Sequence, residues 1–221
     1  NADVRIENYR CEEKSFRAQI VMGADRVELG LGVAGAHMMA NACGALCVAE
    51  QLGIASDISI KALAGFAAPA GRGQTTRLGP RENPLLLVDE SYNANPASMR
   101  AALAVFQSIA PAATGRKILV IGDMLELGGQ SKALHEALCA DLLLTGADKV
   151  FLAGPYMGGL AGVLKGKIAI GGTGANGKEI KDALMESLAY GDAVMVKGSK
   201  GVGLGQVVLA IRERFGGNRA S

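Results

Sequence analysis

The stretch from Leu85 to Leu103, "LLLVDESYNANPASMRAAL", contains the pattern that decides the fold. It opens with a short apolar run and continues with a cluster of polar residues, which predicts a buried strand that ends in a loop. Asn95 is a favourable helix N-cap, and Pro96 suits the first helical position because the N–H that proline lacks would have no partner there. The stretch therefore predicts a strand, a polar turn and a helix.

The same alternation of strand and helix continues to the end of the chain. The further apolar runs are "KILVIG", "KVFLAG", "KIAIGG" and "DAVMVKG". The expected helices lie near residues 96–110, 131–145, 156–165, 177–190 and 202–214. Short apolar runs between amphipathic helices are typical of a parallel sheet with helices on both faces. We therefore predict an α/β fold for residues 72–221, with a Rossmann-like, mostly parallel sheet that binds ligands beyond the carboxyl ends of its strands.

A different block precedes this domain. Residues 4–31 predict three strands separated by polar turns, and two helices are expected after them, at 34–52 and 58–66. Asp57 is in a position to cap the second helix. The Gly-, Pro- and Arg-rich stretch "APAGRGQTTRLGPRENP" marks the junction between the blocks. We therefore predict an incomplete β-plus-helix domain over residues 1–71, whose first two residues resemble the scar of a cleaved expression tag.

Composition excludes several classes of protein. Of the 221 residues, 49% are hydrophobic, and 23 Lys and Arg against 21 Asp and Glu leave a formal charge of +2. This balance offers no electrostatic basis for binding nucleic acid. The most apolar stretch, residues 33–54, carries His, Asn, Glu and Gln side chains, so we expect no insertion into a membrane.

Two groups of residues raise the question of a metal site. Cys43 and Cys47 are four apart in a helical pattern, and we interpret the chain's four cysteines as reduced thiols of a cytoplasmic protein, with a metal edge as the alternative. In "GDMLELGGQSKALHEAL", the residues Asp123, Glu126 and His135 are conceivable ligands, but their spacing matches no known metal motif. We expect no metal site in either place.

The stretch "GGTGANGKEI", residues 171–180, comes close to a phosphate-binding loop. Gly172, Gly177 and Lys178 have the required spacing, but Glu179 stands where a Ser or Thr would hold Mg²⁺. A carboxylate at that point would repel phosphate. We interpret the stretch as a Gly-rich turn with a solvated lysine, and a phosphate site is the alternative.

Three motifs resemble those of the ATP-dependent Mur ligases. They are "DESYNANPASM", "IGDMLELG" followed by "ALHEAL", and "VKGSKG". "GAHMMANACGA" and "PAGRG" likewise resemble that family's central-domain helix and its junction with the C-terminal domain. The resemblance covers nearly the whole chain in the right order. Within the family, the motifs are most similar to those of ligases that join D-alanyl-D-alanine to UDP-MurNAc-tripeptide in peptidoglycan synthesis.

The resemblance implies a domain assignment and a mechanism. Residues 1–71 would be the end of the central ATP-binding domain, and residues 72–221 the C-terminal ligase domain. Members of the family phosphorylate a carboxylate with ATP and Mg²⁺, and an amine then attacks the acyl phosphate. The family's Gly-Lys-Thr phosphate loop, acidic Mg²⁺ ligands and carbamylated lysine have no visible counterpart in this chain. We therefore expect no complete catalytic set here and no activity from the chain alone.

The resemblance also implies site residues. Those implied for ATP are His37, Asn41, Arg72, Asp89 and Glu90. The family commonly has two aspartates where this chain has Asp89 and Glu90, one of them bound to the ribose, so both are retained. Those implied for D-alanyl-D-alanine or the acyl phosphate are Ser91, Tyr92, Asn93, Asn95, Lys197, Ser199 and Lys200.

From the residues alone, several of these assignments have a structural alternative, although a well-formed turn does not explain the cluster of polar residues from Asp89 to Asn93. Asn95 is explained by helix capping, and the two lysines of "VKGSKG" by a solvated Gly-rich turn. Arg72 would then be an exposed linker charge, and His37 and Asn41 would be capping or core polar groups.

Other functions also stay open at this point. Another Mur-type or folylpolyglutamate-type amide ligase would share the fold and the junction arginine. A non-enzymatic nucleotide-binding Rossmann module would need G-x-G-x-x-G after its first strand, which "LLLVDESYNANP" does not supply. We expect a monomer with two small-molecule substrates, UDP-MurNAc-tripeptide and D-alanyl-D-alanine.

Overall fold

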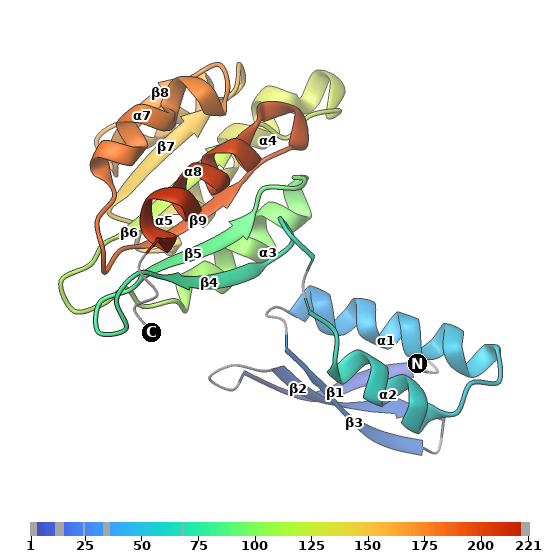
Figure 1. The fold of residues 1–221 in the computed structure, drawn as a ribbon. Helices are drawn as coiled ribbons and strands as arrows, with labels where there is room; N and C mark the ends of the chain where they lie inside the picture. The colour runs from blue at the N-terminus through green and yellow to red at the C-terminus, as the bar shows by residue number, and fades with distance from the viewer. Residues whose placement is uncertain (1–3, 12–15, 24, 33–35, 68, 218–221) are drawn as a thin grey trace. The chain divides into compact units, whose positions relative to one another are not determined.

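The computed structural model describes most of the chain, namely residues 4–11, 16–23, 25–32, 36–67 and 69–217 (Figure 1). The chain divides into two compact units, residues 1–68 and residues 69–221. Each unit has its own hydrophobic core, so each is described by itself. No helix of the described residues is both long enough and apolar enough to cross a membrane.

The first unit is a three-stranded antiparallel sheet with two helices. Its elements are β1 (Val4–Cys11), β2 (Phe16–Met22), β3 (Asp25–Leu31), α1 (Ala36–Gln51) and α2 (Ser56–Ala64). Strand side chains alternate between two faces, so Ala18, Ile20 and Met22 all lie in the core with Met39 and Leu46 of α1. The three strands and the first helix therefore agree with the predicted elements.

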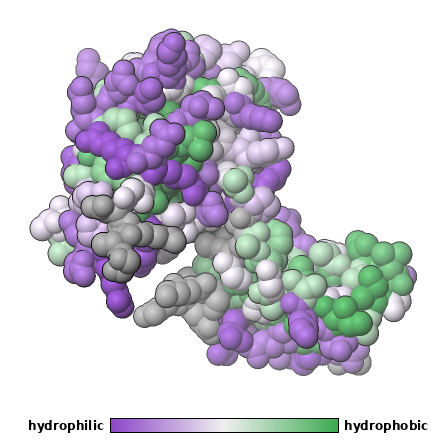
Figure 2. Space-filling view, in the orientation of Figure 1, coloured by the Kyte–Doolittle hydropathy of each residue, from purple (hydrophilic) through white to green (hydrophobic). Residues whose placement is uncertain are grey.

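The second helix of this unit begins earlier than predicted. Ala55 occupies the N-cap of α2 and no side chain caps the helix, so the prediction of Asp57 as the cap was wrong. Asp57 lies in the first turn instead, where its charge still complements the helix dipole. None of the side chains of α2 is buried. An exposed apolar patch in Figure 2 extends from the end of α1 to the start of α2 and includes Val48, Leu52, Ile54 and Ile58.

The second unit contains a six-stranded sheet in the order β4-β5-β9-β6-β7-β8. The strands are β4 (Gln74–Leu78), β5 (Leu85–Glu90), β6 (Lys117–Gly122), β7 (Lys149–Ala153), β8 (Ala169–Gly174) and β9 (Ala193–Lys197). All pairs are parallel except β4 with β5, so the predicted α/β class with a mostly parallel sheet is confirmed. The edge strand β4 was not predicted because its sequence, "QTTRL", has no apolar run and buries only Leu78.

Helices cover both faces of this sheet (Figure 1). They are α3 (Pro96–Gln107), α4 (Ser131–Glu136), α5 (Leu138–Leu144), α6 (Met157–Leu164), α7 (Gly177–Ser187) and α8 (Leu204–Gly216), with short 3₁₀ helices η1 (Gly128–Gln130) and η2 (Lys200–Val202). One core cluster joins the sheet to α7 and α8, and the other joins it to α3, α5 and α6. The two clusters contain alternate residues of the same strands, as Ile118 and Leu119 illustrate.

The predicted helix over 131–145 is two helices, because the chain bends at Ala137. The bend lets α4 pack against α6 while α5 packs against α3.

The order of the strands in the sheet brings three loops together at the carboxyl ends of the parallel strands. The last strand, β9, lies between β5 and β6, so the loops after these three strands are neighbours. In open α/β sheets, ligands bind at such a reversal of strand order, outside the carboxyl ends of the strands. The loops that carry "SYNANP", "GDMLELG" and "GSKG" all start at this edge.

Candidate ligand site at the carboxyl ends of β5, β6 and β9

Asp89, at the end of β5, holds the junction residues against the sheet. Its side chain is buried, and Oδ1 accepts hydrogen bonds from the Ser91 amide at 3.1 Å and the Ser91 hydroxyl at 2.7 Å. Oδ2 accepts from the Gly71 amide at 3.2 Å and lies 3.7 Å from Nη2 of Arg212. Both carboxylate oxygens are thus occupied by the protein. Sequence reasoning did not single out Arg212, because only the packing of α8 brings it to this edge.

Lys197 connects the end of β9 to the loop after β5. Its side chain is 2% exposed, and Nζ lies 3.4 Å from Glu90 Oε2 and 3.1 Å from the Asn93 carbonyl oxygen. Burial lowers the pKa of Lys197, and the nearby Glu90 carboxylate opposes that shift. The lysine therefore holds two residues of the site in place and has little access to solvent.

On the solvent side of this site, the exposed ring of Tyr92 lies near two cationic side chains, those of Arg72 and Lys200. Tyr92 is 43% exposed, the Arg72 guanidinium carbon lies 4.0 Å from its ring centroid, and Lys200 Nζ lies 5.8 Å from it. Neither cation forms an ion pair with another described residue. Gly71 is required beneath this cluster, since its φ is +77° and a Cβ would lie 2.9 Å from Tyr92 Cβ. Two unpaired cations beside an aromatic ring can bind a carboxylate or a phosphate.

Ser199 joins the three loops of the site. Its hydroxyl accepts a hydrogen bond from the Leu125 amide at 3.0 Å and donates to the Ala94 carbonyl at 3.4 Å. Its amide donates to the Asp123 carbonyl at 2.9 Å. Ser199, in the loop after β9, thus contacts both the loop after β5 and the loop after β6, so it fixes the relative positions of these loops.

The two asparagines of "SYNANP" have different surroundings. Asn95 Oδ1 accepts from the Ser98 amide at 2.8 Å, and Ser98 Oγ accepts from the Asn95 amide at 3.0 Å, which is a capping box for α3. Asn93 Oδ1 accepts from the Ala94 amide at 2.8 Å, and within the described structure its side-chain nitrogen has no hydrogen-bond partner. Asn93 is therefore the freer of the two amides.

The remaining two predicted ATP residues belong to the first unit. Asn41 lies on α1 and is exposed, and His37 lies in the first turns of the same helix. The side chain of His37 is outside the described part of the structure. The contacts above therefore unite the predicted residues of the second unit only.

The near-Walker stretch lies at the turn between β8 and α7. Asn176 Oδ1 accepts from the amides of Lys178 at 3.0 Å and Glu179 at 3.3 Å, while Glu179 Oε2 accepts from the Ala175 amide at 2.8 Å. The amides that a phosphate would need are thus bound to side chains. Gly177 is required for packing, since a Cβ there would lie 2.9 Å from the Gly203 carbonyl oxygen. This geometry supports the interpretation as a structural turn.

The described residues include no group of three or more His, Cys, Asp or Glu side chains that could hold a metal ion. Asp123 Oδ1 lies 3.7 Å from His135 Nε2, but Glu126 is exposed. Burial raises the pKa of the Cys43 thiol, and the neighbouring Cys47 adds to that shift.

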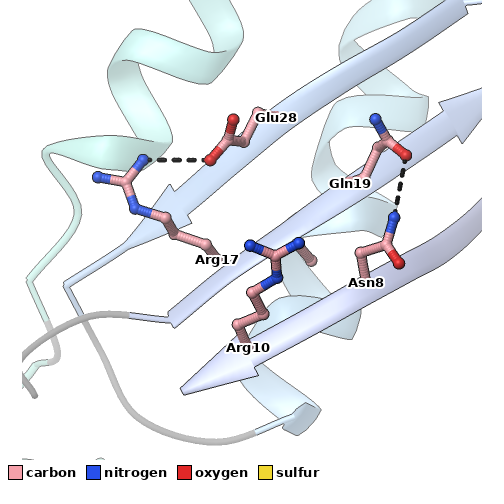
Figure 3. A pocket seen from close by; sticks show the side chains of 6 residues that line it. Asn8, Arg10, Arg17, Gln19 and Glu28 are labelled. Atoms are coloured by element: carbon pink, nitrogen blue, oxygen red, sulfur yellow. Dashed lines mark hydrogen bonds and ion pairs between the residues drawn. The ribbon is translucent and has the colours of Figure 1, made fainter. Parts of the chain in front are cut away.

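A small hollow lies on the polar face of the first unit's sheet (Figure 3). It is lined by Asn8, Arg10, Arg17, Ala18, Gln19 and Glu28. Arg17 and Glu28 form an exposed ion pair at 3.3 Å, and Asn8 donates to Gln19 at 3.3 Å. Hydrogen bonds and ion pairs of this kind are usual on the solvated face of an antiparallel sheet.

Comparison with known proteins identifies the class. The family described as "Mur ligase, glutamate ligase domain" matches residues 71–200, which include most of the polar edge described above. The chain therefore belongs to the Mur ligase family.

Two curated relatives of this chain share one name within that family. UDP-N-acetylmuramoyl-tripeptide–D-alanyl-D-alanine ligase of Rickettsia prowazekii is 31% identical over 94% of this chain and 44% of its own length. The Escherichia coli protein of that name is also 31% identical, over 96% of this chain and 45% of its own length. This chain thus spans less than half the length of these relatives.

Solved structures agree on the fold. A MurF crystal structure from Acinetobacter baumannii has a TM-score of 0.79 at 26% identity, and it covers 96% of this chain and 45% of that one. The Thermotoga maritima MurF structure in complex with ADP has a TM-score of 0.75 at 24% identity, with 96% and 47% covered.

Proposed function

We propose that this chain is part of an ATP-dependent amide ligase that joins D-alanyl-D-alanine to UDP-MurNAc-tripeptide in peptidoglycan synthesis. The observation that carries the proposal is the family match over residues 71–200 together with the curated relatives of that name. Residues 72–221 would form the C-terminal ligase domain, and residues 1–71 the end of the central ATP-binding domain. We further propose a monomer in the cytoplasm.

The chemistry of the reaction calls for cations at the domain edge. The substrate carboxylate takes a phosphoryl group from ATP, the amine of the dipeptide attacks the acyl carbon, and the bond to phosphate breaks as the amide bond forms. The carboxylate, ATP and the acyl phosphate that take part in these steps are all anionic, so positive side chains stabilise the charge that develops during the reaction. Arg72 and Lys200, which have no ion-pair partner among the described residues, supply that charge in our proposal. Arg72 would contact ATP phosphates, and Lys200, with Tyr92 and Asn93, the dipeptide or the acyl phosphate.

The internal contacts suggest different roles for the other predicted residues. Both oxygens of Asp89 are occupied, whereas Glu90 Oε1 accepts no hydrogen bond from another described residue. We therefore assign the ribose contact to Glu90. In this proposal Ser91, Asn95, Lys197 and Ser199 support the loops, and His37 and Asn41 remain assigned to ATP.

ATP and Mg²⁺ would be held mainly by the part of the relatives' length that this chain does not span. The chain has two Gly-Lys pairs, and the residues after them are Ile168 and Glu179, not Ser or Thr. When bound, Mg²⁺ would neutralise charge on the transferred phosphoryl group. The second unit's role is to present the dipeptide amine and exclude water from the acyl phosphate.

The test measures ADP release by the full-length protein with ATP, UDP-MurNAc-tripeptide and one amine at a time. We expect turnover with D-alanyl-D-alanine and none with single amino acids. Turnover with glutamate or another single amino acid would instead identify a different amide ligase of the family. Binding of ATP without turnover for any amine would favour the nucleotide-binding module.

The 221-residue chain is tested separately in the same assay. We expect ADP release no higher than the background without protein, because the chain has no phosphate loop of the family's type. Turnover by this chain alone would contradict the proposed domain assignment.

A further inference from the structure

A buried acid and a buried histidine lie directly beneath the site. Asp123 follows β6 and His135 lies on α4, and the side chains of both are fully buried. Asp123 Oδ2 accepts a hydrogen bond from the Tyr156 amide at 3.2 Å, but Oδ1 has no hydrogen-bond partner. The base that faces Oδ1 is His135 Nε2, at 3.7 Å. The proposed reaction uses neither residue, so their burial calls for another explanation.

The hydrogen bonds of His135 define its protonation state. Nδ1 lies 2.6 Å from the Ser131 carbonyl oxygen, and Nε2 lies 2.8 Å from the Met124 amide nitrogen. A carbonyl only accepts hydrogen bonds and a backbone amide only donates them. Nδ1 must therefore carry a hydrogen and Nε2 must not, so the structure requires neutral His135 in the Nδ1–H tautomer.

This histidine is connected to the site through consecutive backbone amides. Met124 donates to His135, and the next amide, that of Leu125, donates to the Ser199 hydroxyl. Ser199 immediately precedes Lys200, whose Nζ lies near the Tyr92 ring. In the same loop, Glu126 has a φ of 65°, a left-handed conformation that is unfavourable for a residue with a side chain. The loop keeps this conformation only if its contacts hold it.

We propose that His135 and Asp123 are positioning residues that hold the 123–127 loop and, through Ser199, place Lys200 beside Tyr92. With Nε2 unprotonated, His135 accepts the Met124 amide and the loop is held. A proton on Nε2 displaces that amide, and the new N–H is directed instead to the unpartnered Asp123 Oδ1. The pair therefore gives the loop a held state and a released state.

Within the described structure, two titratable side chains from other parts of the chain face the His135 ring. Asp123, which follows β6, faces the His135 ring. Tyr156, at the start of α6, stacks on that ring, with 5.5 Å between the two ring centroids. On its own helix, Lys132 and Glu136 pair with each other at 3.9 Å. Asp123 is thus the acidic group that receives the displaced hydrogen bond.

Nuclear magnetic resonance on the 221-residue chain tests the tautomer directly. The chain has only two histidines, and the ring signals lost in His135→Gln identify those of His135. Long-range ¹H–¹⁵N spectra show which ring nitrogen carries the hydrogen. We expect Nδ1–H at neutral pH, and an Nε2–H tautomer would overturn the proposal.

Two substitutions separate positioning from a general effect on folding. The Gln oxygen of His135→Gln can replace Nε2 as the acceptor for Met124, whereas His135→Asn keeps a group near Nδ1 but offers no such acceptor. We expect hydrogen exchange of the Met124 and Leu125 amides to accelerate about tenfold in His135→Asn, the effect of losing one hydrogen bond of ordinary strength, and much less in His135→Gln. The buried amide of Val150 in β7 should be unchanged in both. Equal acceleration in both variants, or in neither, would overturn the proposal.

If His135→Asn does not fold, Ser199→Ala gives an independent test. It removes the acceptor for Leu125 and leaves His135 intact, so exchange should accelerate at Leu125 and not at Met124. Acceleration at Met124 alone would contradict the proposed order of contacts. None of these measurements depends on ligase activity, so the inference can fail while the proposed function stands.

Discussion

Single polar side chains at this sheet edge divide into those with hydrogen bonds to the protein and those without such bonds among the described residues. Asp89 and Ser199 make several internal hydrogen bonds, whereas the Lys200 side chain lies near the Tyr92 ring and has no hydrogen bond or ion pair within the described residues. The sequence could predict that polar residues gather here, because they follow a buried strand. It could not separate the two groups, because the partners are as far away in sequence as Leu125 is from Ser199.

Lys200 provides the residue-level test of ligand binding. In the full-length protein, Lys200→Ala should raise KM for D-alanyl-D-alanine about tenfold or more, as expected for the loss of a charge-assisted contact. Lys178→Ala is the matched control, since Lys178 lies in the first turn of α7, where its amide and that of Glu179 are already bonded to Asn176. Steady-state kinetics of both variants decide the matter. Equal effects of the two substitutions would argue against a specific role for Lys200.

The buried carboxyl group of Asp123 predicts a pH dependence of stability. Burial raises the pKa of Asp123, an effect that the hydrogen bond from the Tyr156 amide partly opposes. Because the native state then binds this proton more tightly than the unfolded state, the contribution to stability is complete below about pH 4 and is lost as the pH rises through the raised pKa. Asp123→Asn, which cannot ionise, should therefore lose less stability than the unsubstituted chain as the pH rises from about 4 through the raised pKa of Asp123. Urea unfolding measures the difference, and Asp182→Asn on the exposed side of α7 should leave the pH dependence unchanged.

Gly154 gives a prediction about close packing. Its φ is +133°, and a Cβ at this position would overlap the Asp123 carboxyl group. Gly154→Ala should destabilise the chain by about 3 kcal/mol or more, because backbone strain adds to the steric conflict. At Gly162 on α6, an added Cβ would meet no atom within 4 Å, so Gly162→Ala should stabilise by roughly 0.5–1 kcal/mol. Chemical denaturation would refute the argument if the two substitutions had similar effects.

At the scale of helices and strands, the sequence was most informative where a buried strand meets a capped helix. The bounds of β5 and β6 are those of the apolar runs "LLLVDE" and "KILVIG", and α3 begins at Pro96 as its N-cap predicted. The sequence was least informative for β4, whose pairing with β5 depends on a neighbouring strand rather than on its own composition. The bend at Ala137 also depends on packing, since α4 and α5 both contact α6 while α5 contacts α3 as well.

The cap of α3 can be tested by substitution. Asn95→Ala should reduce the free energy of unfolding by about 1 kcal/mol, because the Ser98 amide loses its acceptor. Asn95→Ser should retain most of the stability, since serine is also a good N-cap. Denaturation curves of the two variants compare these effects. A loss as large for Ser as for Ala would show that capping is not what Asn95 contributes to the fold.

At the scale of the whole molecule, the chain consists of two units with separate cores. The junction residues are attached to the second unit, because the Gly71 amide bonds to Asp89 and the Gly73 amide donates to the Asp89 carbonyl at 2.9 Å. The predicted function of the junction arginine therefore belongs with the polar edge of that unit, where Arg72 contacts Tyr92.

Truncation tests the independence of the second unit. A chain of residues 69–221 should fold by itself, because its sheet is covered on both faces by its own helices. Residues 80–221, which lack β4 and Gly71, should be less stable, since Asp89 then loses the Gly71 amide and the sheet loses its edge strand. Circular dichroism and thermal unfolding compare the two. An unfolded 69–221 chain would contradict the division into two units.

The sequence by itself determined the fold class and the position of the candidate site. Periodicity and capping are local properties, so alternating apolar runs and helices suffice to predict a parallel sheet with a polar edge. Only the tertiary structure decided the strand order, the antiparallel edge strand, which polar residues stay free, and the tautomer of His135. These depend on contacts between residues distant in the chain, such as Asp123 with Ser199, which no local pattern encodes.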